Sequence, residues 1–375
     1  MRTLAPLSLA AVAFASFSTA SPVCAKSFKS SVGTLKVVTV AQGLSHPWSL
    51  AFLPNDGMLV TERDGRMRVV TQQGDVGTPL RGLPRIAAYG QGGLLDVVVD
   101  PDFTTNRTIF FAFSEPGPGG AGTSVARAEL QDGALENVKI IFRMTPKTSA
   151  GRHFGSRIVI ARDSTLFVTI GDRAERKKAQ DMTDNRGMVI RIRKDGSIPT
   201  TNPFVGRNGY RPETWSYGHR NPQGAALHPQ TGDLWIHEHG ARGGDEINVS
   251  QAGRNYGWPI ISYGRHYWGG KIGEGTSKPG MEQPILYWDP SIAPSGMAFV
   301  TGPVFKAWRG DLLVGALKYR MLLRLRFNGT RKIEEERLLQ NIDERIRDVR
   351  IGPRGYIWLL TDSSDGKILR VEPAR

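Results

Sequence analysis

A recurring pattern, a polar turn followed by a short apolar run, most constrains how this chain can fold. The pattern occurs at NDGMLVTE, TNRTIFFAF, RDSTLFVTIGD, TGDLWIHEH, RGDLLVGAL and PRGYIWLLTD. We take one residue of each apolar run as equivalent: Leu59, Ile109, Leu166, Leu234, Leu312 and Ile357. The chain then contains six units, with 50, 57, 68, 78 and 45 residues between successive equivalent positions. Each unit has room for about four strands, and one such sheet cannot bury both of its faces alone. The repeat therefore predicts an all-β, six-bladed β-propeller with its functional site at one mouth of the central channel.

The composition agrees with an all-β chain. The 44 Gly and 23 Pro residues bound short β-rich runs, and no stretch has a clear amphipathic helical pattern. The two long spacings, after Leu166 and after Leu234, predict insertions between strands, and propeller loops gather at the mouths of the channel. We interpret residues 26–375 as a single propeller domain.

The N-terminus has the pattern of an export signal. Arg2 precedes an apolar run that begins at Leu4, and Val23 and Ala25 fit the small-x-small cleavage rule. We therefore expect residues 1–25 to be a signal peptide cleaved after Ala25, with lipidation at Cys24 as the second interpretation. Cleavage removes the only cysteine, so we expect a periplasmic or secreted protein without thiols.

The chain is strongly basic. Its formal net charge is +14, and loss of residues 1–25 removes only Arg2, which leaves +13. Such a field favours anionic ligands. No segment after the signal is long and apolar enough to span a bilayer, and an export signal without basic blocks argues against nucleic acid. We expect neither a membrane span nor a nucleic-acid partner.

Four polar clusters could carry chemistry: GRHFGSRIVI with TIGDR, SYGHRNPQG, HEHGARGGDEIN with NYGWP, and LKYR with RIRDV. Strand ends of successive blades converge on one channel, so these clusters can meet. The cations that would then surround one cavity are Arg220, Lys318, Arg345 and Arg347. Guanidinium forks match carboxylates, so a planar polycarboxylate suits such a cavity better than a single phosphate. Taken singly, each Arg is more readily a strand-surface or ion-pair residue.

A histidine and an aspartate flank two successive predicted strands. His153 precedes the strand RIVI, and Asp172 follows the next strand in TIGDR. An antiparallel pair would bring the two side chains together, and a carboxylate-held histidine is the usual general base near neutral pH. A lone histidine before a strand is more often a hydrogen-bonded turn residue.

The segment HEHGARGGDEIN offers carbonyls and carboxylates together, which hard cations such as calcium require. Its spacing does not match an EF-hand loop. His237 and His239 would share one strand face, but no third zinc ligand is evident, so zinc is the weaker alternative.

The ordered set of motifs resembles the glucose/sorbosone dehydrogenase family, and especially its aldose sugar dehydrogenase branch, which are soluble quinoproteins. The resemblance runs from about Gly43 to Val371 and is carried by GLSHPWSLAFLP, GQGGLLDVVVDPDF, FGSRIVI with TIGDR, YGHRNPQG, HGARGGDEIN, NYGWP, IAPSG and RIRDV. It implies a six-bladed propeller that binds pyrroloquinoline quinone (PQQ) and calcium.

The resemblance also implies roles for single residues. His153 matches the base that takes the proton of the sugar's anomeric hydroxyl while hydride passes to the quinone, and Asp172 matches the carboxylate that orients it. The positions that match quinone contacts are Gln91, Arg220, Asn221, Lys318, Arg345 and Arg347. The positions that match calcium contacts are the carbonyls of Gly240 and Ala241 at the cofactor, and Glu246 and Tyr256 at a second, structural site near Asp245.

We therefore expect oxidation of aldose sugars to lactones by a monomer with an open site, which passes electrons to an acceptor that the sequence does not identify. Arg152 stands where the glucose-oxidising branch has an acidic sugar contact. Two other functions compete with this expectation. A calcium-dependent hydrolase of lactonase type needs metal-binding carboxylates in the channel. A non-catalytic extracellular binding module has no need of His153 together with Lys318, Arg345 and Arg347.

Overall fold

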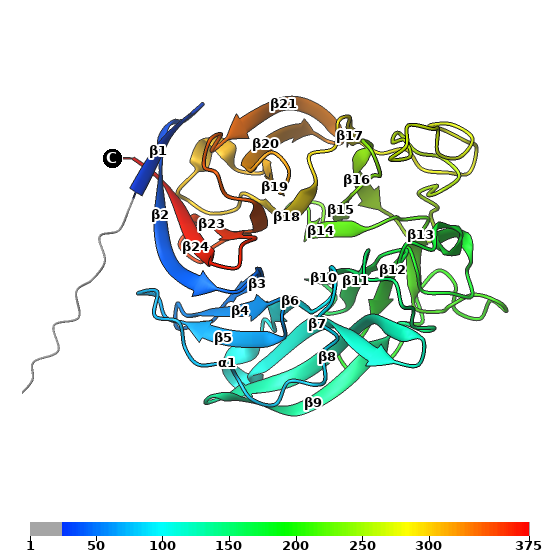
Figure 1. Ribbon diagram of the computed structural model, residues 1–375, viewed down its shortest axis with the longest axis horizontal. Coiled ribbons are helices and arrows are strands. Elements are labelled where there is room, and N and C mark those ends of the chain that lie inside the picture. Colours follow the sequence, from blue (N-terminus) through cyan, green and yellow to red (C-terminus); the bar gives the residue numbers. More distant parts are fainter. Residues whose placement is uncertain (1–24, 375) are drawn as a thin grey trace, which may run out of the picture.

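The structure, a computed structural model, describes residues 25–374. Apart from Ala25, the expected signal peptide and the alternative lipidation site Cys24 lie outside the described residues. Six antiparallel sheets surround a central axis (Figure 1), and the innermost strands β3, β6, β10, β14, β18 and β22 contact one another in a closed ring. The predicted six-bladed β-propeller is confirmed.

The first five sheets follow one another along the chain. Their strands are β3 (Pro47–Phe52), β4 (Met58–Glu62) and β5 (Arg66–Val70); β6 (Leu94–Val99), β7 (Thr108–Gly117), β8 (Gly120–Gln131) and β9 (Ala134–Arg143); β10 (Gly155–Ile160), β11 (Leu166–Ile170), β12 (Met188–Ile192) and β13 (Thr214–Tyr217); β14 (Pro222–Leu227), β15 (Leu234–Glu238), β16 (Asp245–Ser250) and β17 (Leu286–Trp288); and β18 (Pro294–Phe299), β19 (Leu312–Ala316), β20 (Met321–Asn328) and β21 (Arg331–Leu338).

The sixth sheet joins the two ends of the described chain. It consists of β22 (Ile346–Ile351), β23 (Ile357–Thr361), β24 (Gly366–Pro373), β2 (Gly33–Leu44) and β1 (Ala25–Ser30). Strand β2 pairs with β24 from Leu35 opposite Pro373 to Leu44 opposite Gly366, and Figure 1 shows these blue and red strands side by side. Backbone hydrogen bonds between β2, near the start of the described chain, and β24, its last strand, therefore close the ring.

The helical segments are short: α1 (Phe103–Asn106) and the 3₁₀ turns η1 (Arg176–Gln180) and η2 (Lys306–Trp308). None of the helices in residues 25–374 has the length and apolar character needed to cross a membrane.

The repeat in the sequence corresponds to the second strand of each sheet. The six equivalent points lie in β4, β7, β11, β15, β19 and β23. Every residue of β4, β11, β15, β19 and β23 is buried, because neighbouring sheets cover both faces of the strand. A strand covered on both faces is almost continuously apolar instead of alternating, and this run is the signal that recurs along the sequence.

Each of the six interfaces between adjacent sheets has its own hydrophobic cluster. Strand β7 shows how alternation supplies two of them. Phe111 packs towards Leu59 of the preceding sheet, whereas Phe110 packs towards Val168 of the following sheet. Successive strand side chains point to opposite faces, so one strand contributes to both interfaces.

The two expected insertions are present, each between the third and fourth strands of a sheet. Residues 193–213 lie between β12 and β13, and residues 251–285 lie between β16 and β17. The second insertion runs along β13, where Tyr256 N donates to Tyr217 O at 2.8 Å and Trp258 N donates to Gly218 O at 2.9 Å. This pairing carries Trp258 to the mouth of the channel.

A buried cluster of charges occupies the channel axis. Asp96 of β6 and Asp348 of β22 each pair with both Arg157 of β10 and Arg350 of β22, at N···O distances of 2.8–3.1 Å. Ser49 of β3 donates to Asp96 at 2.6 Å. Two carboxylates and two guanidinium groups compensate one another, which a buried ion cluster requires. None of these residues was predicted from the sequence to form an ion cluster.

The first prediction concerns this axial cluster. Burial alone would raise the pKa of Asp96, but Arg157 and Arg350 outweigh it and hold the pKa below its ordinary value. Its contribution to stability is therefore fully present at neutral pH and is lost as the pH falls through that lowered value. We expect Asp96→Asn to reduce the free energy of unfolding by about 3–5 kcal/mol at pH 7, because two buried guanidinium groups then share one carboxylate.

Urea denaturation followed by tryptophan fluorescence measures this loss. The matched control is Asp56→Asn, which removes a surface pair with Arg354 at 2.6 Å and keeps a residue type that tolerates the positive φ of 61°. An exposed pair contributes about 0–1 kcal/mol. Equal effects of the two substitutions would show that the axial ion pairs do not stabilise the ring.

Candidate active site

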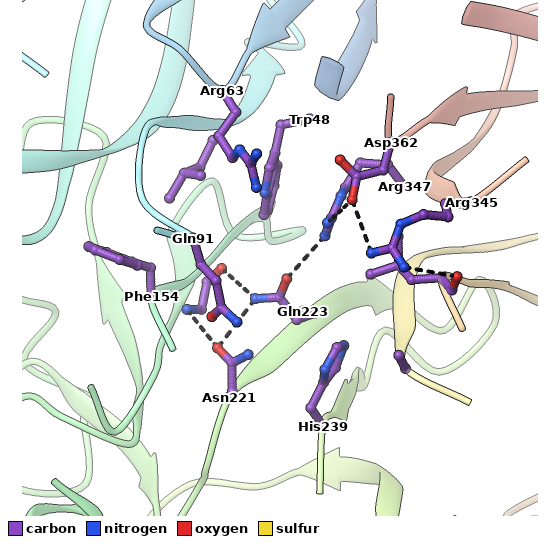
Figure 2. A pocket seen from close by; sticks show the side chains of 14 residues that line it. Trp48, Arg63, Gln91, Phe154, Asn221, Gln223, His239, Arg345, Arg347 and Asp362 are labelled. Atoms are coloured by element: carbon purple, nitrogen blue, oxygen red, sulfur yellow. Dashed lines mark hydrogen bonds and ion pairs between the residues drawn. The ribbon is translucent and has the colours of Figure 1, made fainter. Parts of the chain in front are cut away.

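A cavity of about 200 Å³ opens at the mouth of the channel. We call it the channel cavity. Its lining residues are Trp48, Arg63, Gln91, Leu95, Phe154, Gly155, Asn221, Gln223, His239, Ala293, Leu317, Arg345, Arg347 and Asp362. Figure 2 shows these side chains converging from strand ends of different blades. Segments far apart in the sequence therefore meet here, as the convergence of blades predicted.

The channel cavity carries an excess of positive charge. Arg345 and Arg347 both pair with Asp362, at 3.3 and 2.9 Å, and Asp362 is the only carboxylate in the lining (Figure 2). Burial raises the pKa of Asp362, but Arg347, His46 and Arg345 outweigh it and hold the pKa far below its ordinary value. Arg63 adds a third guanidinium to the lining. Three cations face one carboxylate, so the cavity suits an anion.

Amide side chains complete the wall beside Phe154. Gln223 donates to Gly155 O at 3.2 Å and to Asn221 Oδ1 at 3.3 Å, and Arg347 donates to Gln223 Oε1 at 3.4 Å. Asn221 Oδ1 also accepts from Gly155 N at 3.2 Å. These bonds fix the orientation of Asn221 and Gln223, so the polar wall is organised before any ligand arrives.

A second cavity adjoins the first across His153 and Arg220, and we call it the side cavity. It has about 160 Å³ and is lined by Arg152, His153, Asp172, Ala174, Arg176, Arg220, Ala241, Trp258, His266, Tyr267 and Ile272. His153 and Arg220 of the side cavity are followed directly in sequence by Phe154 and Asn221 of the channel cavity. Ala241 of the side cavity is two positions from His239 of the channel cavity. The two cavities therefore share one wall.

The side cavity contains the His–Asp pair. His153 Nδ1 lies 2.7 Å from Asp172 Oδ1, and Asp172 also accepts from Trp258 Nε1 and from Ala174 N, each at 2.7 Å. The carboxylate is 1% exposed and fully engaged, so it fixes the imidazole with Nε2 as the free nitrogen. This is the arrangement of a general base held by a carboxylate.

The loop before β10 holds His153 in a strained conformation. His153 has φ of 59° and Gly155 has φ of 63°. His153 N donates to Gln91 Oε1 at 2.8 Å, while Arg173 donates to the carbonyl oxygens of Ala150 and Arg152. A non-Gly residue with positive φ persists only where its surroundings hold it, and such residues cluster at active sites. Gln91 and Arg173 provide that support.

Burial governs the proton affinity of His153. It lowers the pKa below 6.5, Asp172 raises it, and the nearby Arg220 lowers it further, with a net lowering. The imidazole is therefore neutral at pH 7 and can accept a proton at Nε2.

Arg220 lies between the two cavities. Its guanidinium donates to the carbonyls of His239 and Gly240 and lies over the Trp258 ring at 5.4 Å. Its main-chain N donates to Glu238. Arg220 therefore connects β14 to the turn after β15 and brings a positive charge next to His153.

The residues expected to contact a cofactor are not all in one place. Gln91, Asn221, Arg345 and Arg347 line the channel cavity, and Arg220 lines the side cavity. Lys318 lines neither cavity: it is exposed just after β19, with its ammonium 5.0 Å from the Tyr319 ring. Lys318 therefore stands at the rim.

The expected calcium residues form two groups. Ala241 lines the side cavity, and the Gly240 carbonyl accepts a hydrogen bond from Arg220. Glu246 pairs across the sheet with Glu238, and burial together with Glu238 raises its pKa to about 8. The Tyr256 hydroxyl accepts from Gln251 N and donates to Val249 O, which leaves only its carbonyl for a metal. Across residues 25–374, no three His, Cys, Asp or Glu side chains converge as metal ligands.

A Ser–His–Glu chain near the site has no access to a substrate. Ser216 Oγ lies 2.9 Å from His219 Nε2, and His219 Nδ1 lies 2.9 Å from Glu238 Oε1. Ser216 and His219 are both 0% exposed. The arrangement has the connectivity of a hydrolytic triad, but its burial assigns it a structural role in holding Glu238 against Arg220.

Sequence reasoning missed Arg63, Trp258 and Arg173. Arg63 lies in the TERDG turn and Arg173 in TIGDR, where each reads as an ordinary turn residue. Trp258 was part of the motif NYGWP, but no sequence pattern predicts that an insertion from the fourth sheet returns to contact Asp172 of the third. Such contacts depend on the path of a long loop.

The fold and site define a β-propeller with a cationic cavity beside a carboxylate-held histidine. The chain belongs to the glucose/sorbosone dehydrogenase family, whose model matches residues 44–370, so the resemblance stated from the sequence is confirmed.

Three relatives illustrate the similarity. Aldose sugar dehydrogenase YliI of Escherichia coli strain K12 is 45% identical over 346 residues, which cover 91% of this chain and 93% of the relative. A crystal structure of a glucose dehydrogenase has 49% identity and a TM-score of 0.89, covering 90% of this chain and 99% of that one. The PQQ-bound form of an aldose sugar dehydrogenase from Streptomyces coelicolor has 27% identity and a TM-score of 0.75, covering 94% and 100%.

The second prediction concerns the proton affinity of His153. Because burial outweighs Asp172, we expect His153 to titrate below pH 6.5 in NMR titrations of ¹⁵N-labelled protein. Asp172→Asn removes the group that raises this pKa, so the titration should move further down. The spectrum of His153→Asn identifies the resonance among the seven histidines. A midpoint above 6.5 in the parent protein would mean that Asp172 dominates and that the base is partly protonated at neutral pH.

Proposed function

We propose that this protein oxidises aldose sugars to lactones with bound PQQ. The observation that carries the proposal is the adjacency of two features: a neutral His153 held by Asp172, and a cavity in which three guanidinium groups face a single carboxylate. A base next to an anion site suits a reaction in which the base takes a proton from the substrate while an anionic acceptor bound beside it takes two electrons.

The residues of the channel cavity fit the quinone. PQQ is flat and carries three carboxylates, and the cavity presents three guanidinium forks together with the amides of Gln91 and Asn221. Trp48 supplies an aromatic wall. When bound, the quinone supplies a two-electron acceptor for the substrate's anomeric carbon. Arg63, Arg345 and Arg347 would bind its carboxylates, and Arg220 would add positive charge from the side cavity.

His153 has the geometry to remove the proton of the anomeric hydroxyl. Its Nδ1 is committed to Asp172, so Nε2 accepts the proton in the side cavity. Asp172 then stabilises the imidazolium, and the hydrogen bonds from Trp258 and Ala174 keep the carboxylate ionised and in place. The sugar would lie between His153 and the channel cavity, with Arg152 at the mouth.

Calcium fits the chain at two places. At the first, the main-chain carbonyls of Gly240 and Ala241 would supply oxygen ligands to a hard cation that neutralises cofactor charge; Gly240 O accepts from Arg220, and Ala241 lines the side cavity. Glu238, together with burial, raises the pKa of the neighbouring Glu246, so a second calcium held by Glu246 and the Tyr256 carbonyl would stabilise the ionised form of Glu246.

We further propose that residues 26–375 form one exported domain that works as a monomer in the periplasm or outside the cell. The support is the signal-peptide pattern of residues 1–25 and the loss of Cys24 with it. The basic charge favours an acceptor of electrons with an anionic surface or group.

The two competing functions lack support in the site. A lactonase-type hydrolase needs carboxylates that hold a metal in the channel, but the only carboxylate lining the channel cavity is Asp362, which is occupied by two guanidinium groups. A binding module does not need a strained, carboxylate-held histidine, and such strain costs free energy.

The third prediction tests the proposed function directly. Purified protein should reduce a redox dye with glucose only after PQQ and calcium are added. His153→Asn should retain the quinone absorbance after desalting and lose about 10²–10⁴-fold in kcat, because the base is removed. Asn tolerates the positive φ of position 153 better than Ala, so the loop is preserved.

The control His228→Asn changes a histidine that stacks on Trp235 away from both cavities, and it should keep parental turnover. A parent protein that fails to retain the quinone would overturn the proposed function. A loss of only a few-fold in His153→Asn would assign the base elsewhere.

The fourth prediction concerns Arg63. Asp362 pairs with Arg345 and Arg347, so removing either of them also breaks an ion pair of the lining, whereas Arg63→Gln leaves both of these ion pairs in place. We expect Arg63→Gln to raise the Kd for PQQ about tenfold, the loss of one charge-assisted pair. Fluorescence titration with the quinone measures this value. Arg354→Gln, a surface substitution, should bind as the parent does, and equal affinity of both variants would exclude Arg63 from the site.

A further inference from the structure

A group of exposed cations surrounds the mouth of the side cavity. Arg152 and Arg176 line the cavity itself, and three others are each adjacent in the sequence to a residue that lines it. Within residues 25–374, none of the five has a carboxylate oxygen within 4.0 Å, so their charge is not neutralised by an ion pair. We call these cations, together with two exposed aromatic residues, the mouth patch. Its members are Arg152, Arg176, Arg242, Arg265, Lys271, Tyr267 and Trp268.

The backbone holds these cations side by side although like charges repel. Arg265 and Lys271 pair across the hairpin of residues 262–275. Arg242, in the turn after β15, exchanges backbone hydrogen bonds of 2.9 and 3.0 Å with Arg265. Arg176 Nη1 lies 3.5 Å from Nε2 of His266, which belongs to the same hairpin. An external anionic group would lower the repulsion that this arrangement imposes.

At the opposite end of the ring, by contrast, several cations have acidic partners. The turns between the first and second strands of three sheets supply aspartates there, with N···O distances of 2.6–3.1 Å. These pairs are Asp56 with Arg354, Asp100 with Lys194 and Asp311 with Arg326. The acidic neighbours of the mouth patch pair elsewhere, Glu175 with Arg186 and Glu274 with Lys278. The mouth patch is therefore a positive surface that its own surroundings do not neutralise.

The centre of the mouth patch is aromatic. Tyr267 is 72% exposed and Trp268 is 79% exposed, the highest values among the large hydrophobic side chains of the described residues. His266 stacks on Trp268 with ring centroids 4.8 Å apart and planes 10° apart, and a Cβ atom at Gly270 would collide with the Trp268 ring. The ring therefore lies flat on the hairpin and presents one face outward. An aromatic centre with a charged rim is the composition of a protein-binding surface.

We propose that the mouth patch docks an acidic electron-transfer protein, which accepts the electrons taken from the sugar. This inference rests on the proposed function, because it needs a reduced cofactor in the channel cavity. Tyr267 and His153 line the same cavity, and His153 directly precedes Phe154 of the channel cavity. A protein seated on the mouth patch thus lies beside the proposed cofactor site.

The stoichiometry of the reaction favours a transient, charge-steered contact. Oxidation of one aldose to its lactone releases two electrons and two protons. A partner with a one-electron redox group must therefore dock twice for each sugar, and the two protons pass to water. Complementary charge raises the rate of such encounters by about 10- to 10³-fold at low salt without requiring tight binding.

An anionic membrane surface is the competing occupant for this charge. Peripheral anchors bury an apolar face about 5–10 Å into the boundary between head groups and acyl chains. The mouth patch has only two aromatic side chains, and Trp268 lies flat against its own hairpin instead of projecting. The mouth patch therefore fits a protein surface better than a bilayer.

The test uses one redox protein in two charge states. Mitochondrial cytochrome c is basic, and succinylation of its lysines makes it acidic. With the protein loaded with PQQ and calcium and glucose as the electron donor, we expect the succinylated form to be reduced about tenfold faster than the native form at low ionic strength. The difference should largely disappear at about 1 M salt, where the Debye length is about 3 Å. Equal rates at low salt would overturn the proposal.

A charge-reversal variant locates the contact. Arg265→Glu combined with Lys271→Glu should slow reduction of the succinylated cytochrome about tenfold at low salt and leave reduction of a small neutral dye at the parental rate, which also shows that the variant is folded. The matched control combines Lys306→Glu with Arg309→Glu. These two cations are also exposed and lie in or beside η2 at the opposite end of the ring. An equal loss in both variants would show that net charge alone matters and would overturn the mouth patch.

A binding measurement separates this inference from the proposed function. Calorimetric titration of the protein without quinone should detect the succinylated cytochrome with the parent and not with the Arg265→Glu, Lys271→Glu variant. Such binding without turnover of any aldose would leave the docking surface standing and overturn the oxidation. Glucose turnover with the dye but no such binding would do the reverse. Binding of the parent to phosphatidylglycerol vesicles, without preference for the succinylated cytochrome, would assign the mouth patch to a membrane instead.

Discussion

The ion cluster on the channel axis is the interaction on which the rest of the structure depends. Asp96, Arg157, Asp348 and Arg350 come from β6, β10 and β22, and Ser49 of β3 joins them. Hydrophobic clusters bind each blade to its two neighbours, and the axial ion pairs connect β10 to β22 on the opposite side of the ring. Isolated charges at this depth would be costly, so the cluster holds only while all of these strands keep their register. Blade packing and axial charge therefore impose the same geometry.

The axial cluster also positions the site. Arg157 donates to Gln223 O at 2.7 Å and stacks over Trp48 at 4.2 Å, and both of these residues line the channel cavity. Arg347 lies three positions before Arg350 in β22 and pairs with Asp362 at the mouth. The base of the cavity is thus a continuation of the structural ion pairs. Positive and negative charges balance at the axis. At the mouth, positive charge is in excess, and an anionic ligand can neutralise it.

Sequence reasoning reached the blades and the His–Asp pair for a physical reason. A strand covered on both faces is mostly apolar, so β11 and β15 can be recognised in the sequence as apolar runs. Antiparallel pairing of β10 with β11 then brings His153 to Asp172. The axial cluster escaped notice because Asp96 and Arg157 each look like a single polar residue in an inner strand. Their meaning appears only when β6 and β10 are neighbours. Lys318 is exposed just after β19 and lines neither cavity, so its contact with the cofactor stays a prediction.

The two cavities divide the requirements of a sugar-oxidising site between different kinds of residue. The channel cavity is walled by inner-strand residues such as Arg347 and Gln223, whose positions the ring fixes, and a tightly held cofactor needs that rigidity. The side cavity ends in a hairpin within an insertion, and insertions can change in length and sequence without disturbing the blades. Within residues 262–275, Ile272 packs with Trp258, and Trp258 donates to Asp172, so one path from this segment to the His–Asp pair runs through Trp258. Changes in this insertion can therefore alter substrate preference while the positions of the base and of the anion site, which the propeller strands fix, remain unchanged.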